Sequence, residues 1–337
     1  MSFVIGLDHG NGWVKAKTAS NELTLPSYYA KLETVNEGYG NNKIEVKEYE
    51  SNISKGEKFV WGSEINRVDH VIPTYGAQDR YKQMPYKLLT EFALADVAAK
   101  EGDAISDVTV VTGVPSIEKG TDAEKDLINV VRGDHLVNIN DRGIILRVSD
   151  VKVLPQPVGV VMSEYLDADG FVEDESFETD SVAVIDIGTG TTDIDHVKSL
   201  KRQKGDSDSI LLGMNDVYRR VADWINSKNT SARATVGKVE SQFANDSYVI
   251  SKRSVIEIDE IKKRALDEVA AELKTEIIGR WKTWERFDRI LLTGGGATQL
   301  GQRLQSLIPD AEIVKSPQTA NVEGFYRYGK SLVGDDE

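Results

Sequence analysis

The sequence has no cysteine among its 337 residues and only 8 prolines. Without thiols the chain can form neither a disulfide framework nor a thiolate metal site, which fits a reducing cytoplasm. No apolar run of about 18 residues is present, so no membrane span and no membrane partner are expected. Residues 2–5 already have the pattern of a β-strand, so we expect no leader before the fold.

Positive charge is also scarce: 41 Lys and Arg stand against 55 Asp and Glu, a formal net charge of -14. A broad nucleic-acid footprint needs clustered Lys and Arg, so direct nucleic-acid binding is not expected. Any connection to DNA would pass through another protein. The hydrophobic content of 40% is enough for a folded protein, and the length favours two lobes over one core.

One stretch carries the chemistry: Val184–Asp193, V-I-D-I-G-T-G-T-T-D. Its apolar start predicts a buried strand that ends on Asp186, and Gly188 and Gly190 predict a turn that leaves the backbone accessible to a ligand. A carboxylate at a strand end beside a glycine turn suits a magnesium-bound phosphate. The alternative is an ordinary β-hairpin whose aspartate caps the turn.

The same pattern opens the chain. Residues 5–12 (I-G-L-D-H-G-N-G) and 183–190 (A-V-I-D-I-G-T-G) both give an apolar strand, Asp, x, Gly, x, Gly. Asp8 matches Asp186 at an offset of 186 − 8 = 178 residues, a little over half the chain. The repeat predicts a duplicated fold of two lobes with a ligand between them.

Two further segments add to this pattern. Pro155 and Pro157 restrict the backbone on either side of Gln156, which fixes the direction of its side chain; the alternative is a polar residue in a rigid turn. Gly294–Gly296 follow a predicted strand and precede a predicted helix, where a ligand ring can lie against the backbone. We expect helices over about 85–100, 121–132, 158–166, 258–281 and 298–307.

Two other nucleotide motifs fit less well. A Rossmann fingerprint needs a third glycine where Gln299 stands, and it belongs after the first strand. The segment Gly324–Ser331, G-F-Y-R-Y-G-K-S, matches a P-loop on paper, but it follows polar residues instead of a buried strand. We predict a helix there that packs its aromatic residues.

Together the three glycine turns and Gln156 resemble the superfamily of actin, heat-shock chaperone ATPases and sugar kinases, in the right order along the entire chain. Within it, the segments 135–140 (H-L-V-N-I-N), 155–159 (P-Q-P-V-G) and 186–193 are most similar to ParM-type bacterial actins, which segregate plasmids. The resemblance implies an α/β protein of two similar actin-like, ribonuclease H-like lobes with a nucleotide cleft between them. Lobe I would be 1–158 plus 317–337, with a small subdomain at about 26–74. Lobe II would be 159–316, with a small subdomain at about 213–270.

The resemblance also implies roles for residues. Asp8 and Asp186 would hold Mg²⁺ through waters, and Gln156 would orient the attacking water, with Asp186 sharing that work. Because glutamine is no strong base, hydrolysis should be slow. Lys15 would contact phosphate, although an exposed strand lysine is the alternative. Glu260 and Lys263 would lie on the adenosine side, although surface charges on a long helix are the alternative.

The implied ligands of ATP, or of GTP, are Asp8, Gly10, Asn11, Gly12, Lys15, Gly188, Thr189, Gly190, Thr191, Thr192, Glu260, Lys263, Gly294, Gly295 and Gly296. His9 and Ile187 depart from residues that are common at their positions in the family, and we assign neither a role.

The predicted function is therefore an ATPase of the bacterial cytoplasm that polymerises into filaments with ATP and Mg²⁺ and segregates plasmid DNA through a DNA-binding adaptor protein. A small-molecule kinase of the same superfold is the alternative, but such kinases are usually longer and need a substrate pocket and a catalytic base. A monomeric chaperone-like regulator would normally carry a substrate domain. The sequence contains no motif for polymerisation itself.

Overall fold

The computed structural model describes residues 3–35, 44–76 and 79–334. The chain forms two compact units. Unit 1 comprises residues 1–175 and 321–337, and unit 2 comprises residues 176–320. Residues 36–43 of the expected small subdomain at 26–74 lie outside the described residues.

Unit 1 is built on one mixed sheet of ten strands within the described residues, in the order β3-β2-β1-β8-β10-β9-β5-β6-β4-β7. Its strands are β1 (Phe3–His9), β2 (Trp13–Lys17), β3 (Glu22–Pro26), β4 (Tyr28–Lys31), β5 (Lys47–Ser51), β6 (Phe59–Trp61), β7 (Val71–Pro73), β8 (Ala104–Val114), β9 (Gly133–Ile139) and β10 (Arg142–Pro155). β1 pairs parallel with β8 and antiparallel with β2, so the first glycine hairpin lies beside the parallel core of the sheet.

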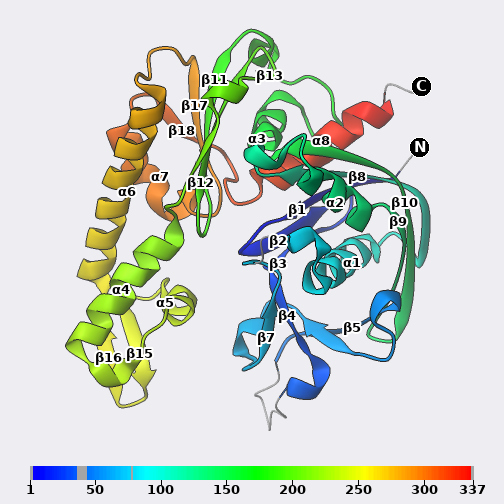
Figure 1. Ribbon diagram of the computed structural model, residues 1–337, viewed down its shortest axis with the longest axis horizontal. Coiled ribbons are helices and arrows are strands. Elements are labelled where there is room, and N and C mark those ends of the chain that lie inside the picture. The colour runs from blue at the N-terminus through cyan, green and yellow to red at the C-terminus, as the bar shows by residue number, and fades with distance from the viewer. Residues whose placement is uncertain (1–2, 36–43, 77–78, 335–337) are drawn as a thin grey trace. The chain divides into compact units, whose positions relative to one another are not determined.

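The helices of unit 1 are α1 (Met84–Ala98), α2 (Asp122–Val131), α3 (Gln156–Tyr165) and α8 (Ala320–Gly334), with short 3₁₀ helices η1 (Leu32–Thr34), η2 (Asn52–Ser54), η3 (Ile65–Arg67), η4 (Arg80–Lys82) and η5 (Ser116–Glu118). α1 is buried over most of its surface, its acids Glu91 and Asp96 included, and it lies against strands of the sheet, among them β9 and β2 (Figure 1). Ile5 and Leu7 of β1 join its hydrophobic cluster, whereas Val4 and Gly6, on the alternate face, lie against α8.

α8 settles the P-loop question. Gly324–Ser331 lies inside this helix, so its backbone cannot wrap a phosphate, and the expectation of a helix is confirmed. Phe325 of α8 is fully buried, in the space that side chains at Gly113 and Gly159 would otherwise fill.

Unit 2 has a sheet in the order β13-β12-β11-β17-β18, with β14 paired to β12, and a separate two-stranded sheet, β15-β16. Its strands are β11 (Ser181–Ile187), β12 (Thr192–Lys198), β13 (Lys201–Arg202), β14 (Asp208–Ile210), β15 (Ser247–Ser251), β16 (Ser254–Glu257), β17 (Arg289–Thr293) and β18 (Ala311–Ile313). β11 pairs antiparallel with β12 and parallel with β17, the arrangement that β1 has with β2 and β8.

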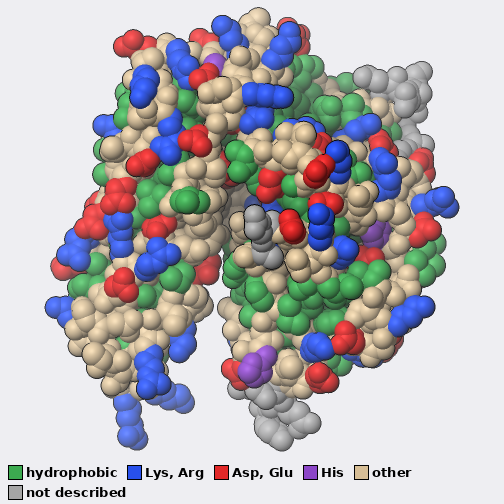
Figure 2. All heavy atoms as spheres, viewed as in Figure 1, with side chains coloured by type: hydrophobic (Ala, Val, Ile, Leu, Met, Phe, Trp, Pro, Cys, Tyr) green, Lys and Arg blue, Asp and Glu red, His purple; other side chains and the backbone are tan. Residues whose placement is uncertain are grey.

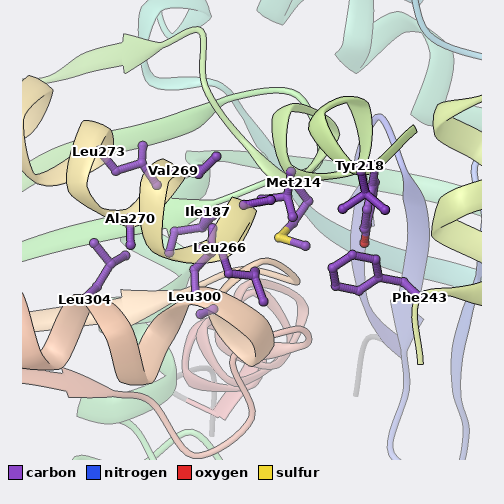
Figure 3. Packing of buried hydrophobic residues seen from close by; sticks show 14 of the residues in the cluster. Ile187, Met214, Tyr218, Phe243, Leu266, Val269, Ala270, Leu273, Leu300 and Leu304 are labelled. Atoms are coloured by element: carbon purple, nitrogen blue, oxygen red, sulfur yellow. The ribbon is translucent and has the colours of Figure 1, made fainter. Parts of the chain in front are cut away.

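The helices of unit 2 are α4 (Met214–Lys228), α5 (Val236–Gln242), α6 (Asp259–Trp281) and α7 (Ala297–Leu307), with η6 (Glu175–Glu178) at the boundary and η7 (Lys204–Asp206) and η8 (Thr230–Ala232) as 3₁₀ turns. The apolar stripe predicted for 258–281 is buried on α6. Figure 3 shows this core, where Ile187 of β11 and Met214 of α4 share one cluster with Leu266 of α6 and Leu300 of α7. The core therefore contacts the end of the strand that carries Asp186.

No helix in the described part of the chain has the length and apolar character needed to cross a membrane. The architecture is a mixed α/β fold with one large sheet in each unit, and unit 2 adds the small β15–β16 sheet.

Candidate functional site

The end of β1 brings three predicted residues of unit 1 together. The β1–β2 ladder places Lys15 directly opposite Asp8, and Nζ of Lys15 donates to Oδ2 of Asp8 at 2.8 Å. Nε2 of Gln156 donates to the other oxygen, Oδ1, at 3.2 Å. Asp8 is 2% exposed. A buried carboxylate thus organises the lysine and the glutamine although they lie far apart in sequence.

Gln156 is the first residue of α3 and does not lie in a separate rigid turn. Pro155 ends β10, and Pro157 lies in the first turn of the helix, where the missing N–H costs no hydrogen bond. Gly113 of β8, which pairs with Leu154, lies beside the side chain: a Cβ there would be 2.9 Å from Cγ of Gln156. The strand end, the helix start and Gly113 therefore fix the place of the glutamine side chain.

The turn of the first hairpin is closed by the N–H of Gly10, which donates to the carbonyl of Trp13 at 3.1 Å. At the tip, Oδ1 of Asn11 accepts from Nη1 of Arg80 at 2.7 Å. Arg80 lies across the ring of Tyr81, 4.8 Å from its centroid, and its buried Nε has no hydrogen-bond partner among the described residues. Sequence reasoning missed Arg80, because no local pattern connects it with a turn 69 residues earlier.

His9, beside Asp8, is buried in unit 1 and makes contacts that support the hairpin from inside. Its two ring nitrogens lie 3.0 Å from Oγ1 of Thr90 and 3.1 Å from Oγ1 of Thr74, and the ring stacks on Tyr86 at 3.9 Å. Burial, followed by the charge of Arg80, holds the pKa of His9 well below its ordinary value, so the imidazole is neutral. The departure from the family pattern at this position is therefore a packing feature.

The second hairpin, in unit 2, repeats the turn hydrogen bond: the N–H of Gly188 donates to the carbonyl of Thr191 at 2.8 Å. The tip is held by backbone groups. The N–H groups of Met214 and Asn215, in the first turn of α4, donate to the carbonyls of Gly188 and Thr189 at 3.2 and 2.7 Å. The first turn of α4 is thus occupied by the hairpin.

Two small residues, Gly213 and Thr192, allow the first turn of α4 to lie against the tip of the second hairpin. Gly213 lies so close that a Cβ would come within 2.8 Å of the carbonyl oxygen of Gly188. Oγ1 of Thr192, a fully buried residue, donates to the carbonyl of Leu212 at 2.8 Å. Gly190 lies at the tip, where a Cβ would meet only Nδ2 of Asn215, at 3.9 Å.

The glycine triplet packs against the same strand end. Gly294 has φ +85°, and a Cβ there would overlap Oδ1 of Asp186 and the carbonyl oxygen of Ile187. The N–H of Gly296 donates to that carbonyl at 2.8 Å, one residue before α7 begins. Gly295 has open space around it, with only Cγ of Gln318 at 4.0 Å. Asp186 and the triplet, predicted separately, are therefore in contact.

Glu260 and Lys263 lie in the first turns of α6, and both are exposed. Nζ of Lys263 donates to Asp259 of the same helix at 2.7 Å. Within the described residues, no hydrogen bond joins either side chain to the glycine triplet. This arrangement is that of surface charges on a helix, and it supplies no evidence for a ligand.

A cleft in unit 1 lies away from these residues. It has a volume of about 1030 Å³ and is lined by β3, β5, the end of α1 and the β9–β10 turn. Asp96 at its wall accepts from Lys47 and from the hydroxyl of Tyr49, both at 2.6 Å. None of the predicted site residues lines it, so it is separate from the glycine hairpins.

Two family models match the chain. Residues 6–159 match the model of the actin-like proteins N-terminal domain, and residues 184–306 match that of the C-terminal part of the archaeal actin homologue MreB-like. The chain is an actin-like protein. Each matched segment contains a different one of the two glycine hairpins.

Solved structures agree with this assignment over the whole length of the actin-like chain. Apo pSK41 ParM is 25% identical with a TM-score of 0.78, and the match covers 99% of this chain and 98% of that one. The archaeal actin homologue Ta0583 in complex with ADP is 18% identical with a TM-score of 0.76, covering 98% and 99%. Bacillus thuringiensis ParM with ATP is 17% identical with a TM-score of 0.71, covering 100% of both chains. No curated protein sequence matches the chain.

Proposed function

We propose that this actin-like protein is an ATPase that assembles into filaments with ATP and Mg²⁺. The observation that carries the proposal is the convergence of Lys15 and Gln156 on buried Asp8, beside a glycine turn. An ordinary hairpin would not need a buried carboxylate with a lysine and an amide aligned on it. Solved structures of the same fold contain ATP or ADP, and one is a 15-stranded ParM filament from Clostridium botulinum.

The residues of unit 1 fit a hydrated magnesium ion. A carboxylate offers about four acceptor positions, and Asp8 uses two of them, for Lys15 and Gln156. The others can accept from waters in the shell that Mg²⁺ keeps. In unit 2, Asp186 lies opposite Asp193 on β12, which adds negative charge at that strand end. The bound cation would offset charge on the phosphates.

Each side chain then has a defined task. Lys15 pairs with Asp8 and would contact a phosphate oxygen of the bound nucleotide. The Nε2 of Gln156 is held by Asp8, which leaves its Oε1 to accept from a water and orient it for attack. Backbone N–H groups of Gly12 and Gly190 would cradle the phosphates, and Gly295, with open space, would let the adenine ring approach. Glutamine is no strong base, so turnover should be slow.

Polymerisation with nucleotide is the most direct test of the proposed function. Purified protein with ATP and Mg²⁺ should scatter light, sediment and show filaments by electron microscopy above a critical concentration. Protein with ADP or without nucleotide should not. A chain that stays monomeric in ATP and transfers phosphate to a metabolite would instead be a kinase of this fold, and the proposal would be wrong.

Gln156→Ala tests the catalytic role. Because a positioned water contributes mainly to the transition state, phosphate release should slow by roughly 10²-fold while nucleotide still binds. Filaments of the variant should persist after the wild type has disassembled. Gln302→Ala, on the exposed face of α7, is the matched control and should behave as wild type. Equal rates in both variants would move the catalytic role to another residue.

We further propose that the filaments move plasmid DNA through a DNA-binding adaptor. The net charge of -14 supports an indirect connection, since the filament would repel bare DNA. Filaments mixed with plasmid alone should leave the DNA in the supernatant on sedimentation. Co-sedimentation without any third component would contradict the adaptor.

A further inference from the structure

A phenylalanine in unit 1 is exposed on a rigid loop. Phe171 is 71% exposed, and Val172 beside it is 45% exposed. Both lie between α3 and β11, in a loop whose neighbouring residues include the acids Asp169 and Glu173. A single exposed apolar side chain is ordinary on a protein surface. An adjacent pair on a backbone that is already fixed is better suited to a contact, because less order has to be gained on binding.

The backbone of this loop is fixed at several points. Oδ1 of Asp167 accepts from the N–H groups of Asp169 and Phe171, both at 2.9 Å. The N–H of Asp167 donates to the carbonyl of Phe171 at 2.8 Å, and Leu166 and Val172 form an antiparallel bridge. Gly170 has φ +88°, and a Cβ there would lie 2.5 Å from the backbone N of Ser331 in α8. The loop thus presents Phe171 at little further entropy cost.

A second exposed apolar pair lies in unit 2, on the hairpin β15–β16. The register places Val249 directly opposite Val255, and they are 47% and 52% exposed. The other face of the hairpin packs through buried Tyr248 into the core of the unit, and the backbone of Val249 is bonded to the side chain of Gln242 in α5. This surface is therefore also rigid.

The charges of the two surfaces are opposite. The turn of the hairpin carries Lys252 and Arg253, both exposed and without an ion pair to any described residue. Figure 2 shows Lys and Arg side chains projecting where Figure 1 labels β15 and β16. The Phe171 loop carries acids: Asp169 is exposed, and Glu173 is 63% exposed with one distant ion pair, 3.7 Å from Arg327.

We propose that the β15–β16 hairpin of one copy docks on the Phe171 loop of a second copy of this chain, as a contact of the filament. This inference rests on the proposed function and names a surface for it. Because the chain is strongly acidic, two copies repel on average, so a contact needs a local basic element that meets acids. A contact between two different surfaces repeats from copy to copy and does not close at a dimer.

The most exposed large apolar side chain of unit 2 offers a competing surface. Leu211 is 87% exposed beside the glutamates of α6. Those acids, however, already have arginine partners: Glu268 and Glu272 bind Arg220, and Glu276 binds Arg280. A basic hairpin would have to displace these arginines, so the Phe171 loop is the better match.

The absence of cysteine makes the contact testable by crosslinking. Val172→Cys and Val255→Cys in one chain should give, with ATP, Mg²⁺ and a mild oxidant, a ladder of disulfide-linked multimers on a non-reducing gel. Each single variant can form at most a dimer. The matched control, Val172→Cys with Leu211→Cys, should give no ladder.

The outcomes separate the inference from the proposed function. Polymer that sediments but forms no ladder overturns the contact alone, as does a ladder from the Leu211 pair or a disulfide confined to one chain. Failure of the wild type to polymerise at all overturns the proposed function, and the contact with it.

Charge reversal supplies a second measurement that does not depend on disulfide geometry. Lys252→Glu with Arg253→Glu, or Asp169→Lys with Glu173→Lys, should each raise the critical concentration about tenfold, because like charges would then meet. The four changes together should return it close to the wild-type value. Nucleotide binding below the critical concentration should stay unchanged in all three. A quadruple variant no better than either double variant would overturn the contact.

Discussion

The hairpins β1–β2 and β11–β12 have equivalent turn hydrogen bonds, and the first strand of each pairs with a parallel strand of its own sheet, β8 or β17. Different kinds of contact nevertheless fix the two turns in place. Side chains hold the first: Arg80 binds the tip, and Lys15 and Gln156 bind Asp8. Backbone groups hold the second, through the first turn of α4 and the glycine triplet.

Equivalent positions make the difference concrete. Lys15 faces Asp8 across the first ladder, whereas Asp193 faces Asp186 across the second. His9 is replaced by the fully buried Ile187. A duplicated backbone pattern can therefore keep its turn while one copy specialises in polar side chains and the other in close backbone packing. We therefore expect the β1–β2 hairpin to tolerate a larger side chain at its glycines better than the β11–β12 hairpin does. The β11–β12 hairpin should in turn be less sensitive to changes of charge and of pH.

Gly294→Ala should have the largest effect. It adds a Cβ where φ is +85° and where Asp186 and Ile187 leave no space, so we expect unfolding to become easier by about 2–4 kcal/mol. Gly295→Ala, with open space, is the matched control and should lower stability by less than about 1 kcal/mol. Urea denaturation of both variants measures the difference. Equal losses would show that the second hairpin is not held by backbone packing.

Arg80→Ala tests the side-chain support of the first hairpin. Loss of the charged hydrogen bond to Asn11 removes about 1.5–3 kcal/mol of support from the tip, so nucleotide affinity should fall roughly tenfold or more. Arg142→Ala, which removes an exposed pair with Asp103, should leave affinity within about twofold. Titration with a fluorescent nucleotide gives both values. Unchanged affinity in Arg80→Ala would mean that the tip is held by its own turn.

The smallest predicted effect concerns pH and His9. Its folded pKa lies below the unfolded value of about 6.5, so the unfolded chain binds the additional proton first. The stability that neutral His9 provides is present above about pH 6.5 and is lost as pH falls, by at most about 1.4 kcal/mol per unit.

His9→Ile places the residue of the second hairpin in the first. The variant should be less stable at pH 7, because two hydrogen bonds to threonines are lost, but its unfolding free energy should fall less between pH 6.5 and 5. The exposed His70 provides the control, His70→Asn, which should keep the wild-type slope. Parallel slopes for wild type and His9→Ile would assign the acid sensitivity to other groups.

The sequence predicts those parts of the molecule that depend on neighbours in the chain. A strand followed by Asp-x-Gly-x-Gly indicates the hairpin at each Asp, and the stripe on α6 indicates its buried face. The mixed α/β fold with two sheets and the membership in the actin-like family are confirmed. The hairpins and the buried face of α6 are predictable because the residues that cause them are neighbours in the sequence.

What the sequence does not reveal depends on contacts between distant residues. Nothing near Arg80 indicates that its guanidinium binds the tip at Asn11, and nothing near His9 indicates that its ring lies between Thr74 and Thr90. The continuous ten-stranded sheet of unit 1 also depends on pairing between β5 and β9, far apart in the chain. Such pairings follow from tertiary packing, which local propensity does not encode.

The return of the chain to unit 1 through α8 has a consequence for synthesis. Unit 2 is one continuous segment, whereas unit 1 needs residues from both sides of it. α8 lies against Gly6 of β1, and its Gly324 packs onto the backbone of Gly159 in α3. During translation, unit 2 can therefore complete its core while the strand that carries Asp8 still lacks its last neighbour. The strand that bears the first hairpin therefore gains its last neighbour only after α8 has left the ribosome.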